Sequence, residues 1–241
     1  MTWTKNKILL ALVGLLVLTN LFTLMLLLNR SIARSPGQSK TASDLKIAVE
    51  RIANSDATPE FKFTKVPVPA PTNAATCAVF SLVTGGWDDN GARVQKLHEG
   101  SLPDGPDAPA ENFFFRDGTY GGRILVDLNQ VVDIKQINTY SWHTGARGPQ
   151  VYKLYARDAM ADGSNPEPVG NKDPLTLGWK LLANVDTRPK MGDPGGQYGV
   201  SITSPFGLVG HYRYLLFDCK RTEEADRWGN TFYSKIDVIA K

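Results

Sequence analysis

Eight short runs of β-forming residues dominate the chain from Cys77 to its end. Each run is rich in Val, Ile, Tyr, Phe and Trp, and clusters of Gly, Pro, Asn and Asp separate them, which is typical of strands joined by turns. The runs lie at 77–83, 122–128, 133–142, 150–158, 179–186, 198–204, 212–219 and 233–239. Because no helical periodicity separates them, the sequence predicts an all-β sandwich or jelly roll whose alternate residues fill the core.

One long apolar segment precedes this body. Residues 8–28, "ILLALVGLLVLTNLFTLMLLL", contain no charge and no proline, and their length suits a helix that crosses a hydrocarbon core. After a short tail at 1–7, we therefore expect a transmembrane helix that stays in place as a signal anchor. The alternative is a cleaved signal peptide, because Lys5 and Lys7 precede the run and the small-residue stretch "SIAR" follows it.

Residues 29–76 have the composition of a stalk. Ser, Thr, Pro, Lys and Ala dominate, and "KVPVPAPTNAAT" carries three prolines at alternating positions, which favour extended chain over helix. Within this stretch, Leu45, Val49 and Ile52 follow helical spacing behind Ser43, a suitable N-cap, so a short amphipathic helix is expected at 43–54. The boundary to the β domain, 77–241, is placed at Cys77.

Composition and motifs argue against two large classes of function. Of 241 residues, 42% are hydrophobic and 21% charged, and the net charge of +3 comes from interspersed basic and acidic residues, so no nucleic-acid partner is expected. The three histidines form no zinc motif, and there is no Gly-x-Ser-x-Gly elbow. Adjacent carboxylates such as Glu223 and Glu224 are explained as solvated loop charge. The chain is therefore predicted not to be an enzyme.

The order of several motifs resembles one family. The stretches are "KLHEG", "GGRILVDL", "DIKQINTYSW", "GPQVYKLYARD", "GWKLLANVD", "HYRYLLFD" and "KIDVI", within residues 80–240. Together they are similar to the discoidin, or coagulation-factor type C, domain, a galactose-binding-like β-sandwich. The resemblance implies a jelly roll outside the cytoplasm, periplasmic or extracellular. It also sets the orientation of the anchor, because the positive charges that flank residues 8–28 are nearly balanced.

The same resemblance bears on metals and cysteines. Some members of this family hold a structural calcium ion near the elements that carry Glu99 and Lys235 here, but an ammonium does not suit Ca²⁺, so no cofactor is expected. A disulfide commonly joins the start and end of such domains, which implies a bond between Cys77 and Cys219. The alternative is two buried free thiols.

The candidate site consists of aromatic, charged and amide side chains in three loops. Such domains usually bind ligands through loops at one end of the sandwich, and sugars are recognised by aromatic faces together with planar or charged hydrogen-bonding groups. The candidates are Trp87, Asp88 and Asn90 in the first loop, Trp142, His143 and Arg147 in the second, and Arg227, Trp228 and Asn230 in the third. An equally weighted alternative places Trp142 in the core, lets His143 satisfy a turn carbonyl and has Arg147 cross-link loops to Asp158.

These observations predict a membrane-anchored, extracytoplasmic binding module for carbohydrate or another cell-surface ligand. The first alternative is a protein–protein interaction or scaffold module on the same fold, with a flatter apolar patch. The second is an accessory hydrolase, which would need a pocket with two separated carboxylates. The sequence leaves the oligomeric state open.

Overall fold

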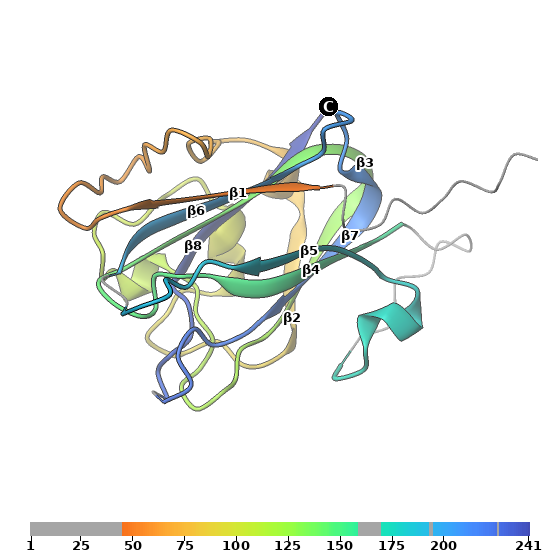
Figure 1. The fold of residues 1–241 in the computed structure, drawn as a ribbon. Helices are drawn as coiled ribbons and strands as arrows, with labels where there is room; N and C mark the ends of the chain where they lie inside the picture. Colours follow the sequence, from red (N-terminus) through yellow and green to blue (C-terminus); the bar gives the residue numbers. More distant parts are fainter. Residues whose placement is uncertain (1–44, 159–169, 193–194, 226) are drawn as a thin grey trace, which may run out of the picture. The chain divides into compact units, whose positions relative to one another are not determined.

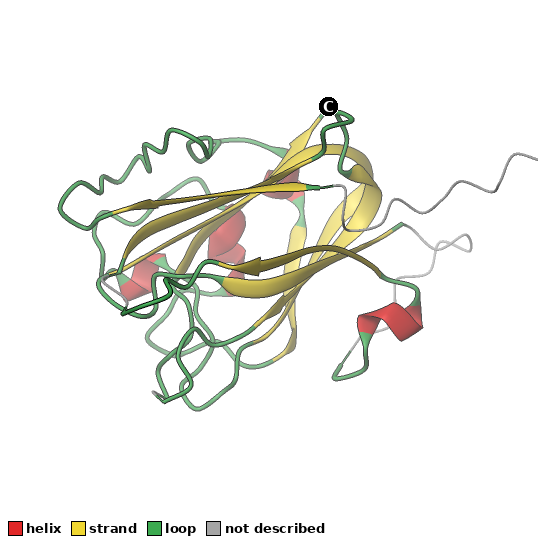
Figure 2. Ribbon diagram, viewed as in Figure 1, coloured by secondary structure: helices red, strands yellow, loops and turns green. Residues whose placement is uncertain are grey.

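The computed structural model describes residues 45–158, 170–192, 195–225 and 227–241, and these form an all-β sandwich (Figure 2). The strands are β1 (Lys46–Ile52), β2 (Val79–Thr84), β3 (Gly122–His143), β4 (Val151–Arg157), β5 (Lys180–Asp186), β6 (Gly196–Thr203), β7 (Gly210–Cys219) and β8 (Tyr233–Ala240). Four short 3₁₀ helices are η2 (Ala74–Cys77), η3 (Val94–His98), η4 (Pro109–Glu111) and η5 (Pro174–Leu177). The predicted all-β class is confirmed.

Strand β3 belongs to both layers of the sandwich. Its first part pairs with β2 from Arg123 to Asp127 and with β7 from Gly122 to Ile134. Its second part, from Ile134 onward, pairs with β8 and β6. The register shifts between Asp127 and Val132, where Asn129 has a φ of 66°, so the strand bends there. One layer is therefore β5–β4–β7–β3–β2 and the other is β1–β6–β3–β8 (Figure 1). The sequence predicted two separate strands here.

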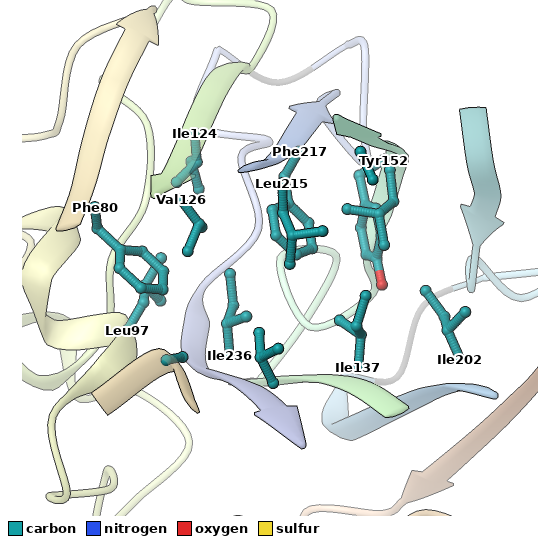
Figure 3. Close-up of a cluster of buried hydrophobic side chains, with 14 of the residues drawn as sticks. Phe80, Leu97, Ile124, Val126, Ile137, Tyr152, Ile202, Leu215, Phe217 and Ile236 are labelled. Atoms are coloured by element: carbon teal, nitrogen blue, oxygen red, sulfur yellow. The ribbon is translucent and has the colours of Figure 1, made fainter. Parts of the chain in front are cut away.

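The core lies between the two layers and is filled by alternate residues. Figure 3 shows Ile124 and Val126 of β3 and Phe217 of β7 in the same cluster as Ile137 and Ile202 of the other layer. On β4, Tyr152, Leu154 and Ala156 point into this cluster and are at most 1% exposed, as the alternation predicts. Each fully buried Leu, Ile or Phe side chain contributes about 1.5–3 kcal/mol of transfer free energy.

The short helix predicted at 43–54 is wrong, because residues 46–52 form strand β1. It pairs antiparallel with β6 along its whole length, from Lys46 opposite Thr203 to Ile52 opposite Gln197. An available partner strand and the β-branched Ile47, Val49 and Ile52 favour the extended form over an amphipathic helix of the same residues. The β domain therefore includes residues from 45 onward, and the boundary predicted at Cys77 is too late.

The proline-rich stretch also belongs to this domain. Residues 53–73, here called the covering segment, lie over the outer face of the layer formed by β6, β3 and β8 (Figure 1). Phe61 and Val66 pack against Tyr140 and Trp142, and the Tyr140 hydroxyl donates to the Pro67 carbonyl (2.8 Å). The stalk predicted up to residue 76 is wrong for this part of the chain, because buried aromatic contacts fix it to the sheet.

The two cysteines carry free thiols, so the predicted disulfide is wrong. The carbonyl of Cys77 accepts a hydrogen bond from Asn129, whereas Cys219 lies opposite Gly122, at the other end of the same part of β3. Seven residues of strand separate these two places by roughly 20 Å, and a disulfide needs Cα atoms within about 7 Å of each other.

Within the described ranges, no helix is both long and apolar enough to cross a membrane. The predicted anchor at 8–28 lies outside the described residues, as does the tail at 1–7.

Candidate functional site

Four loops meet at one end of the sandwich, here called the loop end. They comprise residues 85–93, 113–121, 144–150 and, in the fourth loop, 220–225 with 227–232. The Asp88 carboxylate accepts the Asp117 N–H (3.2 Å), and Asn230 Nδ2 donates to the carbonyls of Phe115 (3.2 Å) and Arg116 (3.0 Å). Arg147 Nε donates to the Asn230 carbonyl (2.9 Å). The three loops that carry the predicted site residues are therefore neighbours in space.

Trp142 is not part of this exposed end. It lies within β3 with 2% of its surface exposed, its ring contacts Phe61 edge-on, and its Nε1 donates to Asn54 Oδ1 (3.0 Å). The covering segment therefore buries the ring that a sugar would have to reach, and the core alternative holds for Trp142.

Arg147 and His143 brace their loop. The Arg147 guanidinium carbon lies 4.0 Å from the ring centroid of Phe232 and 4.6 Å from that of Phe114. His143 contacts Phe232 edge-on, and its Nδ1 accepts the Gly145 N–H (3.0 Å). Both side chains thus hold the loop at 144–150 against the loop that ends at Phe232. Arg147 therefore links loops, as the alternative proposed, but these contacts are to Phe114, Asn230 and Phe232 and the proposed partner was Asp158.

Two further candidates are buried and shape the backbone. Asp88 is 3% exposed, and its Oδ1 accepts both the backbone and the side-chain N–H of Asn90 (3.0 Å each). Asn230 is 1% exposed and its Nδ2 also lies within hydrogen-bond distance of both oxygens of Thr119. These groups satisfy loop carbonyls and amides that burial would otherwise leave unpaired, so they position the loops rather than contact a ligand. Asn90 itself is exposed.

The remaining candidates differ in how much of their surface a ligand can reach. Trp87 is half-buried against the core, and the Arg93 guanidinium covers its ring at 4.1 Å. Trp228 is 41% exposed, and Arg227 beside it is exposed and pairs with Asp117. Of the predicted tryptophans, only Trp228 presents a large part of its surface to solvent.

The sequence analysis missed the aromatic residue with the most exposed surface at this end. Tyr120 is 72% exposed, and the Arg221 guanidinium carbon lies 4.1 Å from its ring centroid. The turn that presents it, "DGTYGG", has φ of 70° at Gly118 and 88° at Gly121, where a Cβ atom would lie 2.1 Å from the Cys219 carbonyl oxygen. Such a glycine-bounded turn around one aromatic residue is a signal that could have identified Tyr120.

Two hollows that share Arg188 open near this end, and Tyr120 lines one of them. One, of about 200 Å³, is lined by Tyr120, Val151, Arg188, Lys220, Arg221 and Glu224. The other, of about 400 Å³, is lined by Ala146, Arg188, Pro189, Gly192, Thr222 and Glu223. Arg188 lies between them, held by hydrogen bonds from Nε (3.0 Å) and Nη2 (2.6 Å) to Asp186, which raise the pKa of the guanidinium and lower that of the Asp186 carboxyl. The hollows therefore combine cationic donors, one carboxylate each and an aromatic ring.

A calcium site does not fit the residues near Glu99. The Lys235 ammonium donates to the Glu99 carbonyl oxygen (2.8 Å). A positively charged group therefore already lies where a calcium ion bound to that oxygen would lie. The described residues contain no group of three or more His, Cys, Asp or Glu side chains arranged to hold a metal ion. Calcium also requires six to eight oxygen ligands.

Comparisons with known proteins give structural similarity only. No protein-family model matches the chain, and no curated protein matches it. CBM32-1 from a family 31 glycoside hydrolase of Clostridium perfringens has a TM-score of 0.43 and 11% identity, over 69% of this chain and 96% of that chain. The family 32 CBM of C. perfringens NanJ, solved in complex with galactose, has a TM-score of 0.44 and 9% identity, over 69% and 97%. GH31 CBM32-2 bound to GalNAc has the same score and identity, over 68% and 97%. Similarity at this level assigns neither a family nor a ligand.

Proposed function

We propose that this protein binds carbohydrate, without turnover, through the exposed aromatic residues and hollows of the loop end. The observation that carries this proposal is the pair of exposed rings, Tyr120 and Trp228, on neighbouring loops. The Gly118 N–H donates to the Arg227 carbonyl (2.9 Å), which ties the turn that carries Tyr120 to the loop that carries Trp228. Exposed aromatic faces suit the apolar faces of sugar rings.

The polar groups around these rings suit sugar hydroxyls, each of which both donates and accepts a hydrogen bond. Lys220 and Arg221 supply donors beside Tyr120, and Glu224 supplies acceptor oxygens in the same hollow. Charge-assisted hydrogen bonds of this kind are stronger than neutral ones. The site thus offers an apolar face and both kinds of polar partner within one surface.

The distribution of carboxylates supports binding rather than hydrolysis. Glycosidases need two carboxyl groups that face each other across the scissile bond. Each hollow of the loop end is lined by one carboxylate, Glu224 in the smaller and Glu223 in the larger. An accessory hydrolase is therefore less well supported than a binding module.

The proposal includes display of the domain from a membrane, with residues 8–28 as the anchor and the domain outside the cytoplasm. Residues 29–44 would connect this anchor to the domain, whose first strand begins at Lys46. This part of the proposal is tested by protease accessibility of the domain in intact cells and after lysis. The experiment uses cells without an outer membrane, so that the protease reaches the outer side of the cytoplasmic membrane. Cleavage of the domain in intact cells supports this part of the proposal, and cleavage only after lysis contradicts it.

The sugar-binding part is tested by screening the full-length protein on a glycan array, with and without Ca²⁺. A Tyr120→Ala, Trp228→Ala double variant is expected to lose binding. The matched control is Phe206→Ala, which removes a ring that is 68% exposed but follows the far end of β6. Binding that survives the double variant, or is lost equally in the control, contradicts the proposed site. No glycan binding by the folded protein contradicts the proposed function and favours a protein partner.

A further inference from the structure

A third cavity lies away from the loop end, under the covering segment. Its volume is about 430 Å³, and its lining is mostly apolar. The lining includes the apolar Val68, Pro71 and Leu102 and the charged Glu60, Lys62 and Lys235. None of them lines either hollow of the loop end, so this cavity is a separate feature of the fold.

One lining residue, Lys235 of β8, is a buried cation. Its side chain is 1% exposed, and burial lowers the pKa of its ammonium. An ammonium has three N–H donors, but within the described part of the chain Lys235 makes one hydrogen bond, to the Glu99 carbonyl (2.8 Å). Its Nζ is 3.9 Å from Asp237 Oδ1, which is too long for a second. The ammonium therefore has unused donor capacity beside a cavity.

The neighbouring carboxylate is occupied elsewhere. Asp237 accepts hydrogen bonds from the Ala70 N–H (2.7 Å) and from Asn73 Nδ2 (2.8 Å), both in the covering segment. Burial raises the pKa of Asp237 to about 6. Asp237 thus balances part of the charge of Lys235 but does not satisfy its hydrogen bonds, and a buried charge with incomplete hydrogen bonding is costly.

We infer that this cavity binds a small carboxylate with an apolar body. The carboxylate oxygens accept charge-assisted hydrogen bonds from the Lys235 ammonium, and the apolar body lies against Val68, Pro71 and Leu102. At the rim, Lys62 adds a second positive charge, although Glu60 lies 3.5 Å from it. An apolar cavity with a few polar groups that fix orientation is the usual form of a small-molecule site.

The test measures binding of short carboxylates to the full-length protein by calorimetry. The probes are butanoate, hexanoate and benzoate, each compared with its uncharged amide. The carboxylates are expected to bind at least about fivefold more tightly than the amides, since a hydrogen bond to a charged group is the stronger kind. Lys235→Met is expected to abolish this preference, and the matched control Lys65→Met, at an exposed lysine outside the cavity lining, is expected to leave it unchanged.

A second variant guards against loss of folding in Lys235→Met. Leu102→Trp adds volume at a partly buried lining position and is expected to abolish binding of acids and amides alike while the protein remains folded. The Tyr120→Ala, Trp228→Ala double variant is expected to bind the carboxylates normally, which separates this inference from the proposed sugar site. Equal affinity for acids and amides, no binding at millimolar concentration, or binding unchanged in Leu102→Trp would overturn the inference.

Discussion

Two regions of the sandwich carry aromatic residues outside the main core. One is the outer face of the β6–β3–β8 layer, where the covering segment buries them, and the other is the loop end, where they are exposed to solvent. Trp142 and Tyr140 lie beneath the covering segment and are at most 2% exposed. Trp228 and Tyr120 are 41% and 72% exposed, although the guanidinium groups of Arg227 and Arg221 lie 5.7 and 4.1 Å from their ring centroids. The difference shows that a segment distant in the chain decides whether an aromatic residue stabilises the fold or is available to a ligand.

The largest effect is expected when the two tryptophans are compared by stability. Trp142→Ala removes a buried ring and the hydrogen bond to Asn54, and should lower the free energy of unfolding by about 3–5 kcal/mol. Trp228→Ala should lower it by less than about 1 kcal/mol, because the ring is partly solvated already. Urea unfolding of both variants measures the difference, and equal losses would refute the contrast between the two regions.

A smaller but clear effect is expected within the loop end itself. Asn230→Ala leaves the carbonyls of Phe115 and Arg116 without their buried donor and should cost about 1–3 kcal/mol. The matched change Asn90→Ala, at an exposed residue of the same end, should cost under about 1 kcal/mol. If the two variants unfold at the same urea concentration, Asn230 does not hold the loops together.

The covered face also predicts a dependence of stability on pH. Burial raises the pKa of Asp237 to about 6 in the folded protein, above its ordinary value, so this group favours folding fully below about pH 4, and that contribution is lost as the pH rises through 6. Lys235 and Tyr140 face the same carboxyl. Between pH 4 and 7, the Asp237 carboxyl should lower the unfolding free energy of the parent protein by roughly 1–3 kcal/mol. The Asp237→Asn variant lacks this carboxyl, so its unfolding free energy should fall by less over the same range. Chemical unfolding at several pH values measures it; identical slopes would contradict the assignment.

The smallest effect is expected from reducing agent. Because Cys77 and Cys219 are free thiols, dithiothreitol should leave the melting temperature unchanged, whereas loss of a native disulfide would cost about 2–5 kcal/mol. The exposed Cys77 should react with a thiol reagent in the native protein. Cys219 should react only after unfolding, since burial raises the pKa of its thiol to about 12. A lower melting temperature in dithiothreitol would contradict the free thiols and support a disulfide between Cys77 and Cys219.

Strands that alternate apolar and polar residues, such as β4, could be predicted from the sequence because the pattern is local. Strand β1 could not be predicted in this way. The spacing of Leu45, Val49 and Ile52 fits an amphipathic helix as well as an edge strand, and only the pairing with β6 decides between the two. The crossing of β3 between layers was also missed, since it depends on the bend near Asn129.

At the site, the sequence identified the loops that meet but not which side chains face out. The burial of Trp142 depends on Phe61 and Asn54, more than 80 residues away, and no local pattern reports that contact. Asp88 and Asn230 have the residue types of ligand-binding groups, yet they satisfy loop backbone. Tyr120 was overlooked, although the glycines around it marked an exposed turn.

The most direct test of the account is a ¹H–¹⁵N spectrum of the tryptophan indoles during titration with a glycan found on the array. Both regions are then observed in one sample, with single substitutions to assign the signals. The account predicts that the Trp228 signal shifts as sugar is added and that the Trp142 signal, whose N–H is bonded to Asn54, stays in place. A shift of Trp142 with Trp228 unchanged would contradict the placement of the binding surface at the loop end.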